Sequence, residues 1–372
     1  MTDALLDAAR DLFPALDEIG AAVPPGEALP RKAMDLLADA GLVGPMVPEE
    51  VGGLGLDVLA TLDLYEEVAR ADGSVGWCYF ASDLTAAYFG AYLPDSGAER
   101  VFAEGVPTMA GQFAPNGTAR AEGDELVLDG DYRFGSGLAH ATWAGAGVMA
   151  TPEDGGDPDY LFACFPADEV DVQGGWDVMG LQATASYDYA VRDVRVPTDQ
   201  SFDFFVPTVH RGRDLHRLGV IPLTAAGHAG WALGVTRRVL DELEGLAAST
   251  TRMGAPSSLA ESDRALVEIG ELEGRWHAGR AFVREAAAAA EAEARDHGAA
   301  GVRAQTLLRE AARHVNQGGA DIARQAYLLA GTTALRDGPI QRGFRDLHAG
   351  AQHFFASPSV AADLARVVLA EA

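Results

Sequence analysis

The spacing of apolar residues changes twice along the chain, and this limits the possible folds more than any other feature. Residues 1–106 have the period of amphipathic helices, as in PRKAMDLLADAG and LDVLATLDLYEEVARAD. Residues 107–206 contain short alternating runs with β-branched and aromatic residues, such as YDYAVRDVRVP. Helical periodicity returns over 207–372. We therefore predict an α+β protein with an N-terminal helical domain, a middle β domain and a C-terminal helical bundle.

The charge balance excludes several partners. Lys and Arg total 28 against 55 Asp and Glu, a formal charge of −27 that repels nucleic acid and anionic membranes. The start, MTDALLDAARDLF, lacks the apolar core of a signal peptide, and the sequence has no apolar run long enough to span a membrane. Two distant cysteines, Cys78 and Cys164, suit buried free thiols. We expect a cytoplasmic protein with no nucleic-acid or membrane partner.

Most familiar motifs are absent or lie in the wrong context. GAGVMA at 145–150 matches G-x-G-x-x-A, but TPEDGGDPD follows it, so no helix N-terminus is available for a pyrophosphate. The signatures of P-loop NTPases, zincins and α/β-hydrolases do not occur. His348 and His353 are five residues apart, on different faces of a helix, and no carboxylate cluster adjoins them. We predict no metal site.

Three stretches of the sequence carry a family resemblance. They are LLADAGLVGPMVPEEVGGLGLDVL, GLQATASYDYAVRDVRVP and, most specifically, residues 330–346. The last stretch contains a Gly pair with its first member replaced, a central proline, an arginine, an aromatic and Arg-Asp, at Ala330-Gly331, Pro339, Arg342, Phe344 and Arg345-Asp346. The chain thus resembles the acyl-CoA dehydrogenase superfamily. That resemblance implies a flavoprotein with a β-barrel or sandwich domain between a helical domain and a four-helix bundle.

The resemblance also implies a flavin site. The family's Trp-Ile-Thr stretch falls on Phe134, Gly135 and Ser136, and GQFAPNG at 111–117 resembles the loop that holds the pyrimidine ring. A hydroxyl can donate to flavin N5 or accept from it, which suits a catalytic role for Ser136. The alternative is that Ser136 only forms a turn. The implied cofactor contacts are Gln112, Phe113, Phe134, Ser136 and Gly137.

One group needed by a dehydrogenase is missing. Acyl-CoA dehydrogenases use a carboxylate to remove the α-proton, and the position eight residues past Arg-Asp is Phe354 in this chain. The alternative position, on the first helix of the bundle, corresponds to about His216. A desaturase acting on a thioester therefore remains an alternative only if His216 replaces the acid.

The contacts specific to FAD are also changed. The family's Arg-x-x-Phe-Gly becomes TTRMG, ending at Met253-Gly254, and two glutamines are replaced by about Glu261 and by Tyr327. An acid facing a pyrophosphate would repel it. We therefore expect reduced FMN or FAD, with FMN preferred. A third reading is a redox-neutral biosynthetic relative that no longer uses flavin.

Two further motifs, RDLHAG at 345–350 and SGLAHATW at 136–143, resemble the two-component flavin monooxygenases built on this fold. This resemblance implies that a separate NAD(P)H:flavin reductase supplies reduced flavin by diffusion. The flavin then reacts with O2 to give a C4a-hydroperoxide, which hydroxylates an aromatic or related small molecule. The resemblance further implies a homotetramer.

The same resemblance assigns roles to polar residues. His348 is the predicted base that deprotonates the substrate hydroxyl, because its reference pKa of about 6.5 suits that task; the alternative is that its imidazole only caps a helix end. Predicted substrate contacts are His140, Trp143, Arg211 and His216. The residues predicted to form an ion-pair network behind the loop of His348 are Arg342, Arg345 and Asp346.

Overall fold

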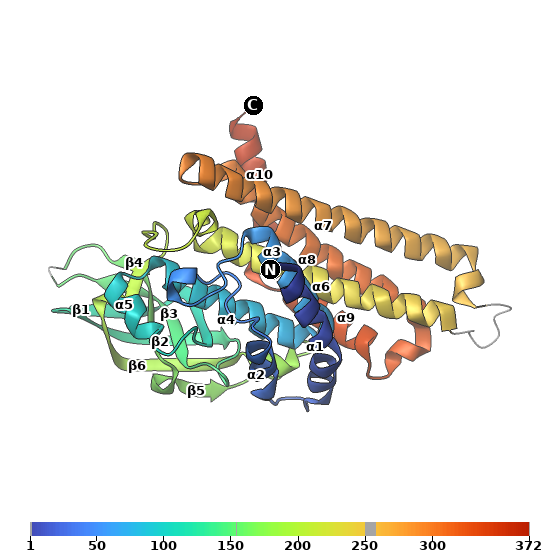
Figure 1. The fold of residues 1–372 in the computed structure, drawn as a ribbon, viewed down its shortest axis with the longest axis horizontal. Helices are drawn as coiled ribbons and strands as arrows, with labels where there is room; N and C mark the ends of the chain where they lie inside the picture. The colour runs from blue at the N-terminus through green and yellow to red at the C-terminus, as the bar shows by residue number, and fades with distance from the viewer. Residues whose placement is uncertain (1, 154, 250–257, 372) are drawn as a thin grey trace.

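The computed structural model describes residues 2–153, 155–249 and 258–371. Helices, then strands, then helices follow one another along the chain (Figure 1). The N-terminal helices are α1 (Thr2–Ala22), α2 (Lys32–Asp39), α3 (Val58–Ala71), α4 (Gly73–Tyr92) and α5 (Asp95–Val101). The C-terminal helices are α6 (Val220–Ser249), α7 (Asp263–His297), α8 (Val302–Ala330), α9 (Pro339–Gly350) and α10 (Pro358–Ala370). This order confirms the predicted fold class.

The middle part is a seven-stranded mixed sheet with strand order β5-β6-β2-β1-β3-β4-β7. The strands are β1 (Met109–Glu122), β2 (Glu125–Gly135), β3 (Trp143–Thr151), β4 (Asp159–Pro166), β5 (Asp171–Gly174), β6 (Tyr187–Pro197) and β7 (Ser201–Asp203). β1 and β3 pair in parallel, and the other neighbours pair antiparallel. The expected barrel or sandwich is therefore built from one hydrogen-bonded sheet.

The sequence pattern predicts strands close to β2, β3, β4 and β6, but it does not predict that β1 is one continuous strand. Pro115, Asn116 and Gly117 are turn formers in the middle of β1. The register between β1 and β3 shifts between Gln112 and Gly117, which is where a bulge accommodates these residues. Pairing on both sides of the bulge therefore overrides local propensity.

Helix α4 occupies the centre of the molecule. Almost all of its residues are buried, and its apolar residues surround the helix instead of forming one stripe. Its N-terminus is capped by Asp72, whose carboxylate accepts from the backbone N–H groups of Ser74 and Val75 at 2.9 and 3.1 Å. Within the described residues, no helix combines the length and apolar character needed to cross a lipid bilayer.

Helix α9 packs unusually close to α6 because it presents glycines there. A Cβ on Gly343 would collide with Val239, and one on Gly350 would collide with the ring of Trp231. These two glycines are seven residues apart, so they lie on the same face of the helix. Pro339 at the first turn fixes where α9 begins. The close approach sets the depth at which the end of α9 enters the molecule.

A buried carboxyl joins the loop before α3 to the core. Asp83, on α4, accepts from the backbone N–H of Met46 at 3.2 Å and from the hydroxyl of Tyr65. The carbonyl of Met46 is bound in turn by His216 Nε2 at 2.9 Å. Burial raises the pKa of Asp83 to about 7. The backbone N–H and C=O groups of Met46 are thus both bound by buried side chains.

We expect Asp83→Asn to change how stability depends on pH. The pKa of Asp83 is higher in the folded protein than the value of about 3.9 expected when unfolded, so between about pH 4 and 7 the unfolded state releases a proton that the native state keeps. The wild type should therefore lose stability relative to Asp83→Asn as pH rises through this window, by roughly 1.4 kcal/mol per pH unit. Urea unfolding at several pH values measures this difference. Parallel pH profiles for the two proteins, with exposed Asp124→Asn as control, would contradict it.

Candidate active site

A cavity of about 640 Å³ lies where the three parts of the chain meet. Its size falls within the range usual for sites that enclose a small molecule. Its walls come from α4, from β1 and β4, from the segment 176–186, from α6, and from the end of α9 with the residues after it. Ligands commonly bind at such junctions between domains.

One face of α4 forms a wall of the cavity. The face consists of Trp77, Phe80, Ala81, Leu84, Thr85 and Tyr88. Their spacing of three or four residues places them in one row along the helix. Since α4 is buried on all sides, this row is the part of its apolar surface that faces the cavity. The apolar character of α4 in the sequence therefore serves both packing and the site.

The residues that line the cavity include no Asp, Glu, Lys or Arg among those the structure describes. The ionisable groups that face it are instead three histidines, His228, His348 and His353, together with Tyr88. Phe354, at the position where a dehydrogenase would carry its base, is not among the lining residues, and its side chain is largely exposed. The site therefore offers imidazoles where proton abstraction from a thioester would require a carboxylate.

His348 lies in the last turn of α9 and faces the cavity. Its Nδ1 lies 2.7 Å from the carbonyl oxygen of Phe344, which can only accept, so Nδ1 carries the proton. The ring also packs on the Phe344 ring, with centroids 4.1 Å apart. The imidazole thus binds the carbonyl of its own helix, as the capping alternative expected. In the neutral tautomer this leaves the lone pair on Nε2.

The sequence pattern did not single out the other two histidines as site residues. The His228 and His353 rings lie 4.1 Å apart, tilted by 33°. His353 Nδ1 accepts from the Phe355 N–H at 3.4 Å, so its proton lies on Nε2. Burial lowers the pKa of His353 to about 4 and that of His228 well below its usual value. Both rings are neutral at pH 7, and only their position in space shows that they belong to the site.

The predicted flavin contacts come together on another wall. Gln112, Phe113, Phe134 and Ser136 all line the cavity, whereas Gly137 lies directly behind it and donates its N–H to Thr184 at 3.2 Å. Phe134 is largely exposed, with 56 % of its surface accessible, and its backbone has a φ of 68°. Such a backbone is strained for a non-glycine residue and is often found at functional positions.

Two backbone amides of this wall are already used. The Gln112 N–H donates to the hydroxyl of Tyr189 at 2.9 Å, and the Ala114 N–H donates to the Gln112 side chain at 3.1 Å. The loop that resembles the family's pyrimidine-binding loop is therefore held by internal hydrogen bonds. The polar side chains of this wall that line the cavity are those of Gln112, Ser136 and Ser186.

The four predicted substrate contacts do not line the cavity. His140 is buried beside a separate cavity of about 130 Å³. Trp143 begins β3 and pairs with Met109. A motif match along the sequence does not show where a side chain lies relative to the cavity, and the structure places neither of these two residues in its lining.

The other two are held by backbone groups. Arg211 donates to the carbonyls of Gly90 and Leu93 and pairs with Asp95 at 2.6 Å. His216 Nε2 binds the carbonyl of Met46, while its Nδ1 accepts from the N–H of Arg213 at 3.0 Å. Burial lowers the pKa of His216. Since both ring nitrogens are used, His216 has no free nitrogen with which to replace a missing acid.

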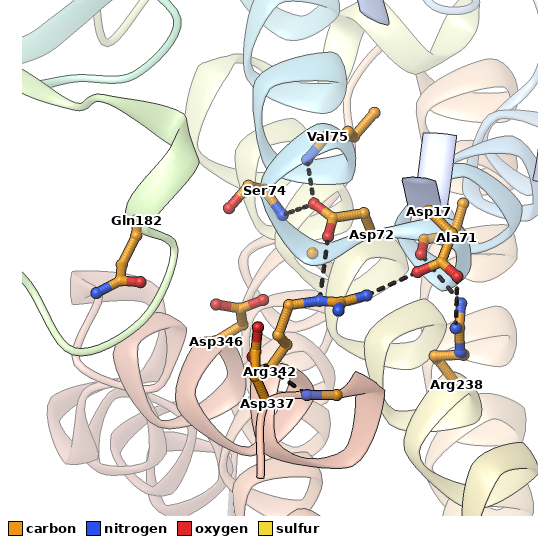
Figure 2. Close-up of polar contacts among 12 residues, drawn as sticks. Asp17, Ala71, Asp72, Ser74, Val75, Gln182, Arg238, Asp337, Arg342 and Asp346 are labelled. Carbon is orange, nitrogen blue, oxygen red and sulfur yellow. Dashed lines mark hydrogen bonds and ion pairs between the residues drawn. The ribbon is translucent and has the colours of Figure 1, made fainter. Parts of the chain in front are cut away.

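The predicted network behind His348 is arranged differently from the expectation. Arg342 binds Asp17 at 2.7 Å and lies 3.8 Å from Asp72, as Figure 2 shows, so it ties α9 to α1 and to the start of α4. Arg345 donates to the side chain of Gln182 at 3.3 Å. Among the described ion pairs, neither arginine pairs with Asp346.

Asp346 instead anchors the wall of the cavity. Its Oδ1 accepts from the backbone N–H of Leu181 at 2.6 Å, which fixes the segment 176–186 to α9. Burial raises the pKa of Asp346 to about 7, and the charge of nearby Asp72 adds to this effect. The backbones of Gly180 and Arg345 approach closely here, which is possible because glycine has no Cβ. A Cβ on Gly180 would collide with the carbonyl of Arg345. Asp346 therefore positions five residues that line the cavity: Trp176, Val178, Met179, Gly180 and Leu181.

Comparison with known proteins places this architecture in a family. Residues 4–101 match the family described as acyl-CoA dehydrogenase, N-terminal domain, and residues 226–358 match the acyl-CoA dehydrogenase C-terminal domain. Together the matches span more than half of the chain. The protein belongs to the acyl-CoA dehydrogenase superfamily.

Within this superfamily, several of the similar proteins are named as monooxygenases. Indole-3-acetate monooxygenase from Pseudomonas putida is 27% identical over 337 residues, which cover 87% of this chain and 83% of the relative. The oxygenase subunit HsaA of a flavin-dependent monooxygenase from Rhodococcus jostii is 26% identical over 52% of this chain and 50% of its own. The prediction of a monooxygenase-type oxidoreductase of the acyl-CoA dehydrogenase superfamily is confirmed by these relatives.

Solved structures of the superfamily share the whole fold. XiaF from Streptomyces sp., solved with FADH2 and glycerol, superposes with a TM-score of 0.89 at 19% identity and covers 99% of this chain and 96% of its own. The dibenzothiophene monooxygenase TdsC from Paenibacillus sp. A11-2, solved with FMN and indole, has a TM-score of 0.84 at 20% identity and covers 99% and 97%.

Positions that differ from the superfamily's FAD pattern are only partly described. Met253-Gly254 lie outside the described residues. The carboxylate of Glu261 accepts from the N–H of Ser258 at 3.0 Å, so it serves as a helix cap. Tyr327 packs on the Phe344 ring, with centroids 5.0 Å apart. Tyr327 thus supports the phenylalanine on which His348 rests.

We expect Asp346→Ala to loosen the segment 176–186. The Leu181 N–H would lose its buried carboxylate acceptor, so its amide hydrogen should exchange about tenfold faster or more. Hydrogen exchange with mass spectrometry measures this. Asp346→Asn keeps an acceptor oxygen and should retain most of the protection. If Asp346→Ala leaves exchange of this segment unchanged, Asp346 does not hold it.

Proposed function

We propose that the protein is the oxygenase component of a two-component flavin-dependent monooxygenase that hydroxylates an aromatic or related small molecule. The observation that carries the proposal is a cavity lined largely by apolar side chains, together with three imidazoles and with no carboxylate among its described lining residues. Exclusion of water is what oxygen transfer from a reactive flavin adduct requires. The relatives named as monooxygenases support the same chemistry.

The residues present fit the ring system of a flavin. The wall with Ser136, Phe134 and Trp176 supplies one hydroxyl and two aromatic side chains, whose ring centroids are 6.2 Å apart. When bound and reduced, the flavin would react with O2 to give the C4a-hydroperoxide that supplies the oxygen atom. We propose that Ser136 contacts the N5 edge of the ring, and that Phe134 and Trp176 cover it at the mouth.

The substrate would bind further along α4. Tyr88 is 11 residues beyond Trp77 on the same face, or about 16 Å along the helix. The lining there consists of Leu84, Phe162 and the paired hydroxyls of Tyr88 and Thr224, 2.6 Å apart. This end suits a flat apolar ring with one polar substituent. Indole in the TdsC complex is a ligand of that kind.

His348 and His353 would have different roles in proton transfer because their tautomers differ. His348 has its proton on Nδ1 and presents a lone pair on Nε2, so it can accept the proton of a substrate hydroxyl as the ring carbon attacks the peroxide. His353 has its proton on Nε2 and can only donate from that atom. We propose His348 as the general base and the His228–His353 pair as a neutral wall that orients the substrate.

The cofactor source and type follow from the same arrangement. Because the described residues that line the cavity include no cation, the ring system would carry most of the recognition and the phosphate end would lie outside. This favours FMN over FAD, and a flavin that arrives by diffusion from a separate NAD(P)H:flavin reductase. The neighbouring structures hold FADH2 in one case and FMN in another.

The test is a stopped-flow experiment. The protein is loaded anaerobically with reduced FMN or reduced FAD and mixed with oxygenated buffer, while the near-ultraviolet spectrum is followed. A long-lived hydroperoxide spectrum is the expected result, and the flavin that gives it identifies the cofactor. Oxidation at the rate of free flavin with both cofactors would refute the monooxygenase function and turn attention to thioesters or redox-neutral chemistry.

We expect His348→Ala to separate flavin oxidation from hydroxylation. Loss of a general base should lower the hydroxylation rate about 10²- to 10⁴-fold, while reduced flavin still binds and its oxygen is released as hydrogen peroxide. Product and peroxide formed per flavin oxidised measure this coupling. His297→Ala, on the exposed end of α7, is the matched control. Intact coupling in His348→Ala, or a larger loss in His353→Ala, would remove His348 from the base role.

A further inference from the structure

Three buried or half-buried hydroxyls form a chain behind the Ser136 wall. The indole Nε1 of Trp77 donates to Ser136 Oγ at 3.0 Å. Ser136 Oγ and Ser186 Oγ are 2.7 Å apart, and Ser186 Oγ and Thr184 Oγ1 are also 2.7 Å apart. Thr184 Oγ1 then donates to the carbonyl of Leu181 at 2.8 Å. The chain thus runs from an obligate donor to an obligate acceptor.

The two ends fix the direction of every hydrogen bond between them. A carbonyl can only accept, so the single hydroxyl proton of Thr184 points at Leu181. Thr184 must then accept from Ser186, whose only proton is spent there. Ser186 must in turn accept from Ser136. The hydroxyl proton of Ser136 is therefore directed away from the cavity.

This direction leaves Ser136 with acceptor capacity alone. One lone pair of its oxygen receives the Trp77 N–H, and the other faces the cavity that Ser136 lines. Reversing the chain would free the Ser136 proton for the cavity, but it would leave the oxygens of Thr184 and Leu181 2.8 Å apart with no proton between them. The reversed state therefore lacks one hydrogen bond.

We propose that this hydroxyl chain makes the site select a flavin that carries a proton on N5, with Ser186 and Thr184 as the residues that set the polarity of Ser136. Reduced flavin and its oxygen adducts present an N5–H donor, whereas oxidised flavin presents an acceptor at N5. The inference rests on the proposed flavin site. Oxidised flavin would place its N5 acceptor against the acceptor lone pair of Ser136, or would require the hydroxyl chain to reverse. It would therefore leave the site after turnover.

The test compares binding of the two redox states of FMN. Dissociation constants for oxidised FMN, by fluorescence, and for reduced FMN, by anaerobic titration, are measured for the wild type and for Thr184→Val. Valine has nearly the shape of threonine but cannot donate to Leu181, so the remaining hydroxyls can reverse at no cost. The ratio of oxidised to reduced dissociation constants should fall about fivefold, the value of one hydrogen bond. This equals a fall of about 20 mV in the two-electron potential of bound FMN.

Further variants keep the test decisive. Ser186→Ala breaks the chain at its middle and should lower the ratio in the same way, so the test does not depend on the folding of Thr184→Val alone. The matched control is Thr306→Val, whose hydroxyl bonds within α8 at 2.7 Å and does not line the cavity.

The outcomes separate this inference from the proposed function. If the wild type binds both redox states equally, or if Thr184→Val and Ser186→Ala both keep the wild-type ratio, the polarity inference is overturned while the flavin site stands. If the wild type binds neither FMN nor FAD in either state, both fail together. A lowered ratio in both variants, with Thr306→Val unchanged, supports the inference.

Discussion

The buried indole of Trp231 is the contact on which the arrangement of the site depends. It has no exposed surface, and its Nε1 donates to the carbonyl of Gly73 at the start of α4 at 2.8 Å. Its ring fits against Gly350 of α9 and lies edge-on to Trp77, with centroids 4.9 Å apart. One side chain of α6 thereby fixes α4 and α9, the two helices whose residues face each other across the cavity. Trp77 in turn contacts Ser136, so the β domain is joined to the same centre.

The charged side chains that the structure describes near the site do not line the cavity. The described residues that line the cavity include no Asp, Glu, Lys or Arg, and burial lowers the pKa of the lining histidines His228 and His353. The charged groups lie one layer behind, where Arg342 joins Asp17 and Asp72 (Figure 2). Asp346 holds the Leu181 amide in the same layer. In the proposed function, such a layout would keep water and ions away from a reactive oxygen donor while the charges still fix the walls. Selectivity would then come from the direction of the hydrogen bonds in the hydroxyl chain that ends at Ser136.

How far the sequence predicted the site can be followed residue by residue. The predicted residues His348 and Ser136 both line the cavity, and each lies within a contiguous motif that local order along the chain is enough to mark. His140 and Trp143 lie in an equally good motif but are not among the residues that line the cavity, because contacts between distant segments decide which side chains reach it. His216 has the right residue type near the right position, yet both of its nitrogens bind backbone groups. His228 is surrounded by apolar residues of an ordinary helix and carries no local signal at all.

The sequence by itself determined the order of helical, β and helical parts, the family and the absence of a carboxylate at the usual position of the base. These properties depend on periodicity and on contiguous motifs, which are local along the chain. Only the tertiary structure decided which side chains meet, which tautomer each histidine adopts and which way the Ser136 proton points. Those properties depend on partners from distant segments: Trp77 with Ser136, Asp346 with Leu181 and His228 with His353. The physical reason is that a hydrogen bond or ring contact depends on distance in space, whereas sequence patterns report only distance along the chain.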